Sequence, residues 1–460
     1  MLSRRKFLGA SFSVCALPSL SVTGDINKSI KRYKLVADQS HHTFSDDLPS
    51  TNLWLYNNHC PGPLITANKG DVLEVFFTNK LDQPTSIHWH GIRNLNKMDG
   101  VPGLTQKAVE PGESFTYRFP LNDSGSFWYH AHNRAWEQVS RGLYGALLVL
   151  EEQNWMNVRD RVLLIDDWRI DQDGLFDQAS LGNLHDWSHR GRLGNFLTVN
   201  GKSGPKIDLP FNGSVRLRFI NSANARVMVF KLNDGLPAKI ISLDGSPCKP
   251  FFTDRLTLAP GQRMDAMITD CSQLDNLWEI STRQEFIAAR FSPVMTVPVD
   301  RGKKYSSDFW YPLPSRINAK IIDIDMRGGA MGNLNYAVFQ GEKRDLRDLA
   351  INEKKIWALN GKIGSYGLNL GTISLGEVAI LRVLNDTAWD HVMHLHGQHF
   401  WVKSKEFGDD AKYVLRDTYL MKPKEKADLI FSADNPGLWL FHCHTLEHHA
   451  AGMAGVISVI

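Results

Sequence analysis

Short hydrophobic runs separated by turn residues recur along the chain beyond residue 30. Examples are "DVLEVFFTN", "SFTYRFPL", "GALLVLEE", "SVRLRFINS", "EVAILRVLND" and "GVISVI". Runs of this length, rich in Val, Ile, Phe, Leu and Thr and bounded by Gly, Pro, Asn and Asp, are typical of β-strands. Their spacing indicates β-sandwiches or Greek-key barrels. The pattern therefore predicts a mainly antiparallel, all-β chain with few helices.

A weak internal repeat divides this pattern into three units. Residues 71–91, 214–232 and 377–397 each place a strand, an Asn-containing turn and a second strand in the same order. Repetition at more than a hundred residues indicates duplicated domains rather than a solenoid. We expect boundaries near residues 152 and 312, and hence domains 25–152, 153–312 and 313–460. The charged stretch 342–355 is interpreted as a solvated linker or a short helix.

Composition and charge exclude several classes of protein. The 460 residues are 43 % hydrophobic and 22 % charged, as in an ordinary globular chain. Arg4, Arg5 and Lys6 supply three positive charges in residues 1–24, which hold no Asp or Glu, so the formal charge falls from +3 to zero without them. A neutral chain gives no global electrostatic reason to bind nucleic acid or an anionic membrane.

The first residues are typical of an export signal. Arg4 and Arg5 are followed by Lys6, Phe7 and Leu8 and by a short apolar run that ends near Pro18. This order resembles a twin-arginine signal peptide, which we place at residues 1–24; an ordinary basic signal peptide is the alternative. The apolar run is too short to anchor the mature chain in a membrane. We therefore expect a periplasmic or otherwise exported protein.

Histidines are paired far more often than chance predicts. With 17 histidines in the chain, about one His-x-His pair is expected, whereas four occur, two in the first unit and two in the third. Residues i and i+2 of a strand point to the same face, about 6.6 Å apart, so each pair can bind one metal ion or two adjacent ones. The pairs are His88/His90, His130/His132, His394/His396 and His442/His444.

The triplet "HCH" at the start of "HCHTLEHHAAGM" indicates a second centre. Strand alternation points Cys443 to the face opposite its two histidine neighbours. His448 and Met453 follow, and His391 precedes "HLHG". A thiolate, two imidazoles and a weak thioether are typical of a blue-copper site. Zinc is the competing metal, but structural zinc sites usually use more than one cysteine.

Four segments together carry a family resemblance. "HWHG", "WYHAH", "HVMHLHGQHF" and "HCHTLEHHAAGM", in this order, resemble the multicopper oxidases, and in particular bacterial laccase-like members. The resemblance covers residue 35 to the end and implies three cupredoxin-like Greek-key β-barrel or sandwich domains. It also implies four copper ions as cofactor: one type 1 ion, one type 2 ion and a type 3 pair.

The resemblance assigns a ligand to each position. It implies His391, Cys443 and His448 as the strong type 1 ligands, with Met453 axial. It gives the type 2 ion His88 and His394. The type 3 ions are left with two sets of three, His90, His130 and His444 on one ion and His132, His396 and His442 on the other.

The resemblance also implies an activity and its reactants. A reductant loses electrons singly at the type 1 ion, they pass through Cys443, and oxygen is reduced to water at the other three ions. Small aromatic reductants such as phenols are the expected donors, because the 12 methionines form no cluster of the kind seen in some cuprous oxidases. A metallo-oxidase of Cu(I) or Mn(II) is the alternative. A non-enzymatic protein of the same fold is disfavoured, because such a relative would lack the copper ligands found here.

Two further residues are expected to act in proton transfer. By resemblance, Asp99 matches an acidic residue near the type 2 ion, although Asp-Gly is also a common turn. His449 stands where relatives commonly have Glu; it is either a relay with a pKa nearer neutrality or a solvated residue. Val392 stands where many relatives have Pro.

Cysteine usage indicates at most one disulfide. Cys60, Cys248, Cys271 and Cys443 follow the signal segment, which is too few for a disulfide-built fold. If Cys443 binds metal, Cys248 with Cys271 is the more plausible pair, because both fall in the second predicted domain.

Overall fold

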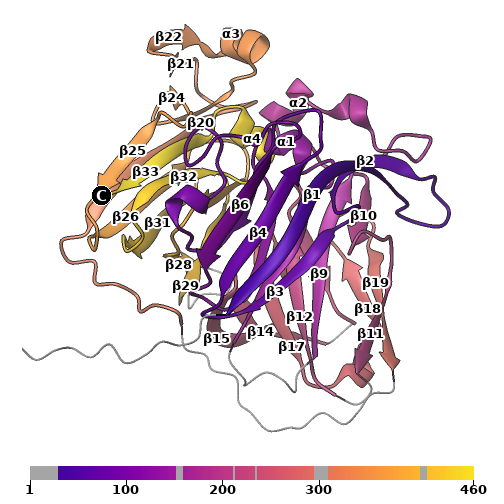
Figure 1. Cartoon of the computed structure of the whole chain (residues 1–460). Helices are drawn as coiled ribbons and strands as arrows, with labels where there is room; N and C mark the ends of the chain where they lie inside the picture. Colours follow the sequence, from indigo (N-terminus) through magenta and orange to yellow (C-terminus); the bar gives the residue numbers. More distant parts are fainter. Residues whose placement is uncertain (1–28, 152–158, 211–212, 234–235, 295–308, 405–411) are drawn as a thin grey trace, which may run out of the picture.

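Six β-sheets arranged as three two-layer sandwiches make up the structure, a computed structural model (Figure 1). It describes residues 29–151, 159–210, 213–233, 236–294, 309–404 and 412–460. The predicted signal segment and Cys15 lie outside these residues. The all-β, three-sandwich architecture is confirmed. The exact domain boundaries stay predictions, since 152–158 and 295–308 are outside the described part.

The first unit packs two four-stranded sheets against each other. In spatial order the first sheet is β2 (Thr51–Tyr56), β1 (Ile30–His42), β4 (Val72–Asn79) and β6 (Ser114–Pro120). The second is β3 (Gly62–Asn68), β8 (Tyr144–Leu150), β7 (Gly125–Ala131) and β5 (Ile87–His90).

The middle unit has sheets of six and five strands. The larger is β10 (Phe196–Val199), β9 (Arg159–Trp168), β12 (Val215–Asn221), β17 (Arg263–Ile268), β14 (Ala238–Leu243) and β15 (Ser246–Thr253). The smaller is β11 (Lys206–Pro210), β19 (Phe286–Val294), β18 (Asn276–Glu279), β13 (Met228–Lys231) and β16 (Leu256–Leu258).

The third unit has sheets of nine and five strands. The larger is β22 (Glu342–Asp345), β21 (Tyr336–Phe339), β24 (Lys362–Ile363), β23 (Trp357–Leu359), β20 (Lys320–Gly328), β26 (Val378–Asn385), β31 (Lys426–Ser432), β28 (Phe400–Ser404) and β29 (Lys412–Arg416). The smaller is β25 (Asn369–Ile373), β33 (Ala454–Val459), β32 (Gly437–Cys443), β27 (His391–Leu395) and β30 (Thr418–Met421).

The three units share one topology. In each, the opening strand of the first sheet lies parallel to a later strand: β1 to β4, β9 to β12 and β20 to β26. In each second sheet an edge strand lies parallel to the last strand of the unit: β3 to β8, β11 to β19 and β25 to β33. The sheets are otherwise mostly antiparallel. The weak repeat in the sequence is therefore a repeat of structure.

Helices are few and short in the described residues, as predicted. Stretch 342–355 is not a simple linker, because its first residues pair with β21 at a sheet edge before the chain turns into two short helical segments. The α-helices are α1 (Ala135–Gln138), α2 (Leu184–Ser188), α3 (Leu346–Asp348) and α4 (Leu446–Ala450), and the 3-10 and π segments are η1 (Asn96–Met98), η2 (Gln178–Ser180), η3 (Cys271–Gln273) and η4 (Leu349–Glu353).

The expected disulfide between Cys248 and Cys271 is wrong. The structure holds the two residues as separate thiols, Cys248 on β15 and Cys271 at the start of η3. Both pack within the hydrophobic core of the middle unit, where cysteine behaves as a small apolar side chain. Burial raises the pKa of the Cys271 thiol to about 11.

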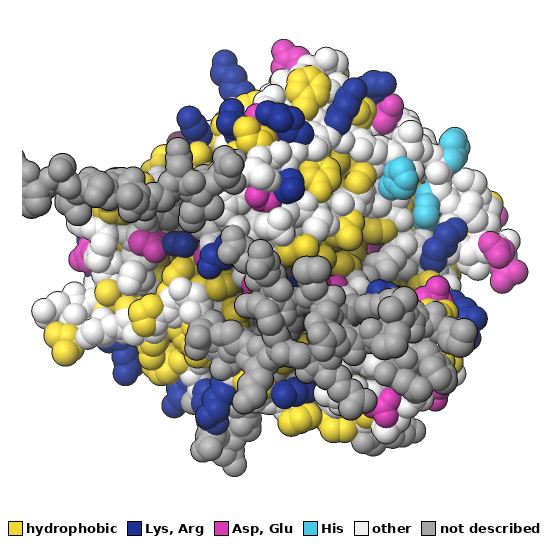
Figure 2. Space-filling model, turned by 60° about the horizontal axis from the view of Figure 1, so that its bottom comes forward, with side chains coloured by type: hydrophobic (Ala, Val, Ile, Leu, Met, Phe, Trp, Pro, Cys, Tyr) yellow, Lys and Arg dark blue, Asp and Glu magenta, His cyan; other side chains and the backbone are white. Residues whose placement is uncertain are grey.

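One face of the molecule carries side chains of both charges. On the face that Figure 2 shows, basic, acidic and hydrophobic side chains are interspersed. Among the described residues, no helix is both long enough and apolar enough to cross a membrane.

Candidate metal centres

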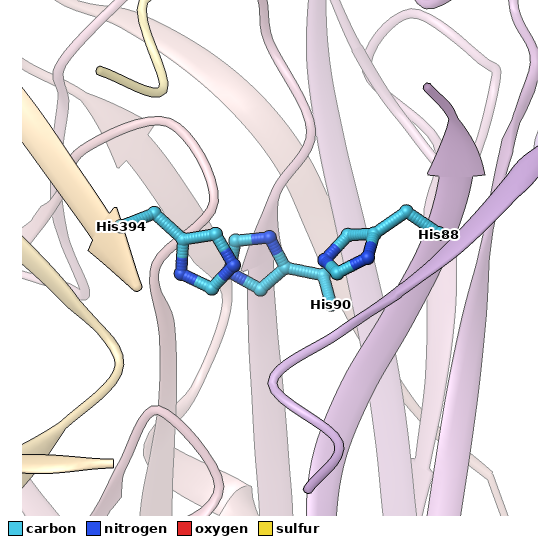
Figure 3. A group of neighbouring side chains, drawn as sticks. All are labelled: His88, His90 and His394. Atoms are coloured by element: carbon cyan, nitrogen blue, oxygen red, sulfur yellow. The ribbon is translucent and has the colours of Figure 1, made fainter. Parts of the chain in front are cut away.

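The eight paired histidines meet at one buried place between the first and third units. His88 and His130 are cross-strand partners on β5 and β7, and His394 and His442 are partners on β27 and β32. None of the eight rings is more than 2 % exposed. The two units touch through stacked rings, since both the His88–His396 and the His90–His394 centroids are 3.8 Å apart. Figure 3 shows His88 and His90 facing His394 across this boundary.

Strand alternation explains why the rings gather here. In β5, Ile87 and Trp89 enter the core of the first unit, so His88 and His90 project from the other face. In β32, Phe441 and Cys443 enter the core of the third unit and His442 projects oppositely. Neither unit could assemble this cluster alone.

Nitrogen atoms of the cluster converge in sets of three. In each set the ligating atoms lie within 4.8 Å of one another. One set joins His88 and His394 with His90, and two others coincide with the sets expected for the type 3 ions. These two sets are His90, His130 and His444, and His132, His396 and His442.

The cluster has the unsatisfied ligand atoms that metal ions require. Hydrogen-bond partners within the described part of the chain are missing for buried nitrogens such as His88 Nε2, His130 Nε2 and both ring nitrogens of His132 and His444. Buried polar atoms normally find partners, so their convergence points to an absent cation. Burial also lowers the pKa of His132 and His444 well below the usual range, which keeps their lone pairs free. The residues present therefore fit copper ions.

Asp99 joins the cluster through two histidines. Its Oδ2 atom accepts a hydrogen bond from Nδ1 of His396 at 2.8 Å, and its backbone carbonyl accepts one from Nδ1 of His88 at 2.8 Å. The carboxylate is 1 % exposed, and Oδ1 lies 3.3 Å from the same His88 nitrogen. Asp99 therefore orients one ring from each unit and can accept or deliver a proton beside them.

Replacing Asp99 with Asn should slow oxygen reduction about 100-fold while leaving the type 1 absorption intact, because the amide keeps the shape but loses the basic oxygen. Steady-state oxygen consumption and the visible spectrum check this expectation. Asp71→Asn removes another buried carboxylate, which accepts from the Asn68 amide, and serves as the control. An unchanged rate in Asp99→Asn would remove this carboxylate from the mechanism.

A second, smaller group forms around Cys443. Its Sγ atom lies 3.6 Å from Nδ1 of His391 and 3.7 Å from Nδ1 of His448, and these two nitrogens are 3.1 Å apart. Met453 is fully buried in the same core, and its backbone binds both Cys443 and His448. Three donors facing one point fit a trigonal copper site with Met453 nearby.

Burial makes the free thiolate of Cys443 unfavourable. It raises the pKa of the thiol to about 11, so ionisation near neutral pH needs a bound cation. The amide N–H of Val392 donates to Sγ at 3.4 Å. A proline at this position has no N–H to donate, so Val392 supplies a hydrogen bond that also tunes the redox potential of a thiolate-bound metal.

Protein atoms cover the outer nitrogens of both histidines in this group. Nε2 of His391 lies 3.0 Å from Oγ1 of Thr387, and Nε2 of His448 donates to the backbone carbonyl of His189 at 2.7 Å. Trp357 packs on both rings, with centroids at 4.8 and 4.5 Å. The outer nitrogens of both histidines are therefore engaged by protein atoms.

His449 is half-buried beside the histidine cluster. Its ring packs on His442 with centroids 4.3 Å apart and lies 6.2 Å from Tyr366, so the residue is not simply solvated. Burial, with a smaller effect of Lys355, lowers its pKa to about 3. This direction runs against a pKa nearer neutrality. A part in proton transfer stays a prediction.

Sequence reasoning missed a second buried carboxylate beside the cluster. Asp417 accepts a hydrogen bond from Oγ1 of Thr418 at 2.7 Å, and this hydroxyl lies 3.0 Å from Nε2 of His90. Its backbone carbonyl accepts from Nδ1 of His394 at 2.8 Å. Arg263 of the middle unit holds the carboxylate with bonds of 2.8 and 2.6 Å. The sequence signal that could have revealed it is the acidic residue in the mostly apolar run "VLRDTYLM". A carboxylate that such a run buries requires a hydrogen-bonding or charged partner.

Comparisons with known proteins find the same family that the histidine motifs resemble. Three family models described as multicopper oxidase match residues 38–154, 159–303 and 339–460. The multicopper oxidase MmcO of Mycobacterium tuberculosis is 29 % identical over 100 % of this chain and 97 % of its own. Laccase-1 of Botryotinia fuckeliana is 29 % identical over 90 % of this chain and 79 % of its own.

Solved structures of multicopper oxidases also match the chain. A multicopper oxidase crystal structure from Pseudomonas thermotolerans matches with a TM-score of 0.78 and 29 % identity, over 94 % of this chain and all of that one. A Campylobacter jejuni multicopper oxidase described as a metallo-oxidase matches with a TM-score of 0.76 and 27 % identity, over 94 % and 91 %.

Proposed function

Because the chain belongs to the multicopper oxidase family, we propose that it couples one-electron oxidation of small aromatic reductants, such as phenols, to four-electron reduction of oxygen to water. Copper would be held by the Cys443 group and by the histidine cluster, and would supply the one-electron oxidation and the oxygen reduction respectively. Cys443 bridges the two, since its backbone neighbours His442 and His444 belong to the cluster. Asp99 holds or moves a proton beside that cluster.

A cleft next to Cys443 is the observation that supports an aromatic reductant. It has a volume of about 330 Å³ and is lined by Arg190 and Arg226 of the middle unit and by Trp389, Val392 and Thr445 of the third. This volume accommodates a single substituted ring. The Trp389 indole offers a stacking face, and the Val392 amide at the wall is bonded to Cys443 Sγ.

Replacing Trp389 with Ala should raise the KM for a methoxyphenol about tenfold, because stacking on the indole is lost. The measurement is oxygen uptake by the copper-loaded protein with the phenol, with Cu(I) and with Mn(II) at matched concentrations. Phe252→Ala, which removes a 67 % exposed aromatic from β15, is the control and should leave the KM unchanged. Fast uptake with either metal ion and little with the phenol would contradict the proposed function.

A cuprous ion is the second candidate reductant. It is favoured by the likeness to a structure described as a metallo-oxidase.

A further inference from the structure

The cleft beside the Cys443 group carries an excess of positive charge. Arg190 and Arg226 line it from the middle unit, and Asp390 is the carboxylate among the lining residues that the structure describes. Lys422 donates to Asp390 at 2.8 Å, so this negative charge already has a partner. An anion that enters the cleft therefore meets cations and faces no unpaired carboxylate of the described lining.

Arg190 is the cation that a ligand can engage. Within the described part of the chain it has no carboxylate partner, the residue is exposed, and its guanidinium lies 6.0 Å from the centroid of the Trp389 ring. A hydrogen bond of 2.8 Å from Nε1 to the Ala330 carbonyl holds the indole in place. An aromatic ring stacked on Trp389 therefore lies beside a guanidinium that has N–H groups to donate.

Arg226 differs from Arg190 because the fold already fixes its position. Its Nε atom donates to Asp167 at 2.8 Å and its Nη2 atom donates to the Gly194 carbonyl at 2.6 Å. The side chain is 18 % exposed, and Asp167 offsets part of its charge. Arg226 therefore adds positive charge to the wall of the cleft, whereas Arg190 can turn towards a ligand.

The cleft also reaches the Cys443 group. Arg190 directly follows His189, whose carbonyl accepts a hydrogen bond from Nε2 of His448 at 2.7 Å. The amide of Val392, another lining residue, donates to Cys443 Sγ at 3.4 Å. A molecule held by Arg190 is therefore next to residues that contact two of the expected copper ligands.

We propose that the reductants preferred by this cleft are phenols that carry a carboxylate, and that Arg190 binds this carboxylate while the ring lies against Trp389. The inference rests on the proposed function, because it names the substrate class of the same cleft. A guanidinium offers two parallel N–H groups to a carboxylate, which stays ionised near neutral pH. Each phenol gives up one electron and its hydroxyl proton, so four phenols and one oxygen molecule give four phenoxyl radicals and two water molecules.

The test compares 4-hydroxy-3-methoxybenzoate with its methyl ester, which shares the ring and the hydroxyl but has no charge. Oxygen uptake by the copper-loaded protein gives kcat/KM for each. The ratio of the acid to the ester should fall about tenfold from wild type to Arg190→Gln, chiefly through the KM of the acid, because a charge-assisted hydrogen bond is lost. Comparing ratios between proteins cancels the different ease of oxidation of the two rings. Added salt should lower the ratio in the wild type.

Two variants and a binding measurement serve as controls. Arg190→Lys keeps the charge and should retain the ratio to within about threefold of wild type. Arg255→Gln removes an exposed arginine between β15 and β16, outside the cleft, and should leave the ratio unchanged. Calorimetric titration with 3,4-dimethoxybenzoate, which has no phenolic hydroxyl, should give a Kd about tenfold weaker in Arg190→Gln than in wild type.

An unchanged ratio together with an unchanged Kd in Arg190→Gln would overturn the inference. An equal fall of the ratio in Arg255→Gln would also overturn it, because the preference would then come from net charge and not from the cleft. Loss of the blue absorption in Arg190→Gln would do the same, since Arg190 would then support the Cys443 group itself. A wild type that oxidises neither the acid nor the ester would refute the proposed function, and the titration would still decide whether Arg190 binds a carboxylate.

Discussion

Cys443→Ser abolishes the blue absorption and lowers the oxidation of every reductant at least about 1,000-fold, which corresponds to about 4 kcal/mol of activation free energy. The reason is that the thiol sulfur lies 3.6 Å from Nδ1 of His391 and 3.7 Å from Nδ1 of His448, where it completes the group of ligand atoms. A hydroxyl of nearly the same size keeps the packing but does not provide a thiolate. The histidine cluster keeps its eight rings in this variant.

Visible absorption, copper content and oxygen uptake of the copper-loaded variant test this expectation. Cys271→Ser is the matched control, because it also replaces a buried cysteine but lies in η3 of the middle unit, outside both groups of ligands. It should keep the blue absorption and the turnover. Blue absorption that survives in Cys443→Ser would show that Cys443 is not the thiolate ligand.

Arg263→Met should destabilise the protein by about 3–5 kcal/mol, because it leaves the Asp417 carboxylate buried without its cation. Arg263 is fully buried on β17 and joins all three units. It donates to Ser126 of the first unit at 3.1 Å, to the Asp244 carbonyl in the middle unit at 2.9 Å, and to Asp417 of the third at 2.6 and 2.8 Å. Chemical denaturation of the copper-free protein measures the difference.

The same substitution should weaken copper binding at the histidine cluster about 10- to 100-fold, since Asp417 orients Thr418 beside His90. The control is Arg382→Met, which breaks the partly exposed pair with Asp428. It should change the free energy of unfolding by less than about 1 kcal/mol. Equal effects of the two substitutions would mean that the Arg263 network does not hold the units together.

The fold and the ligand candidates were readable from local patterns. Strand periodicity predicted the β-architecture, and the alternation of "IHWH" and "FHCH" put paired histidines on one face of each strand, as the structure has them. The resemblance supplied the division of eight rings into sets. The two sets of three coincide with groups of converging nitrogens, whereas His88 and His394 converge together with His90. Local periodicity was sufficient because each pair lies on one strand or at its end: His132, His396 and His444 directly follow β7, β27 and β32.

Contacts between the units could not be predicted in the same way. Two such contacts are the hydrogen bond from His448 to the His189 carbonyl and the ion pair of Arg263 with Asp417. They join residues that are 259 and 154 positions apart in the sequence. Nothing in either local stretch specifies such a partner. The disulfide prediction failed for a related reason, since two cysteines in one domain pair only if the fold brings them together, and each of these packs into the core instead. The lowered pKa of His449 comes from its burial, which the local sequence does not specify either.

The most direct test of the two copper centres is native mass spectrometry of the copper-loaded protein alongside Cys443→Ser. Four copper ions are expected on the wild type and three on the variant, because the Cys443 group would hold one ion and the histidine cluster three. A wild type that retains only one copper ion, or that retains zinc in preference to copper, would contradict the assignment of the buried histidine cluster.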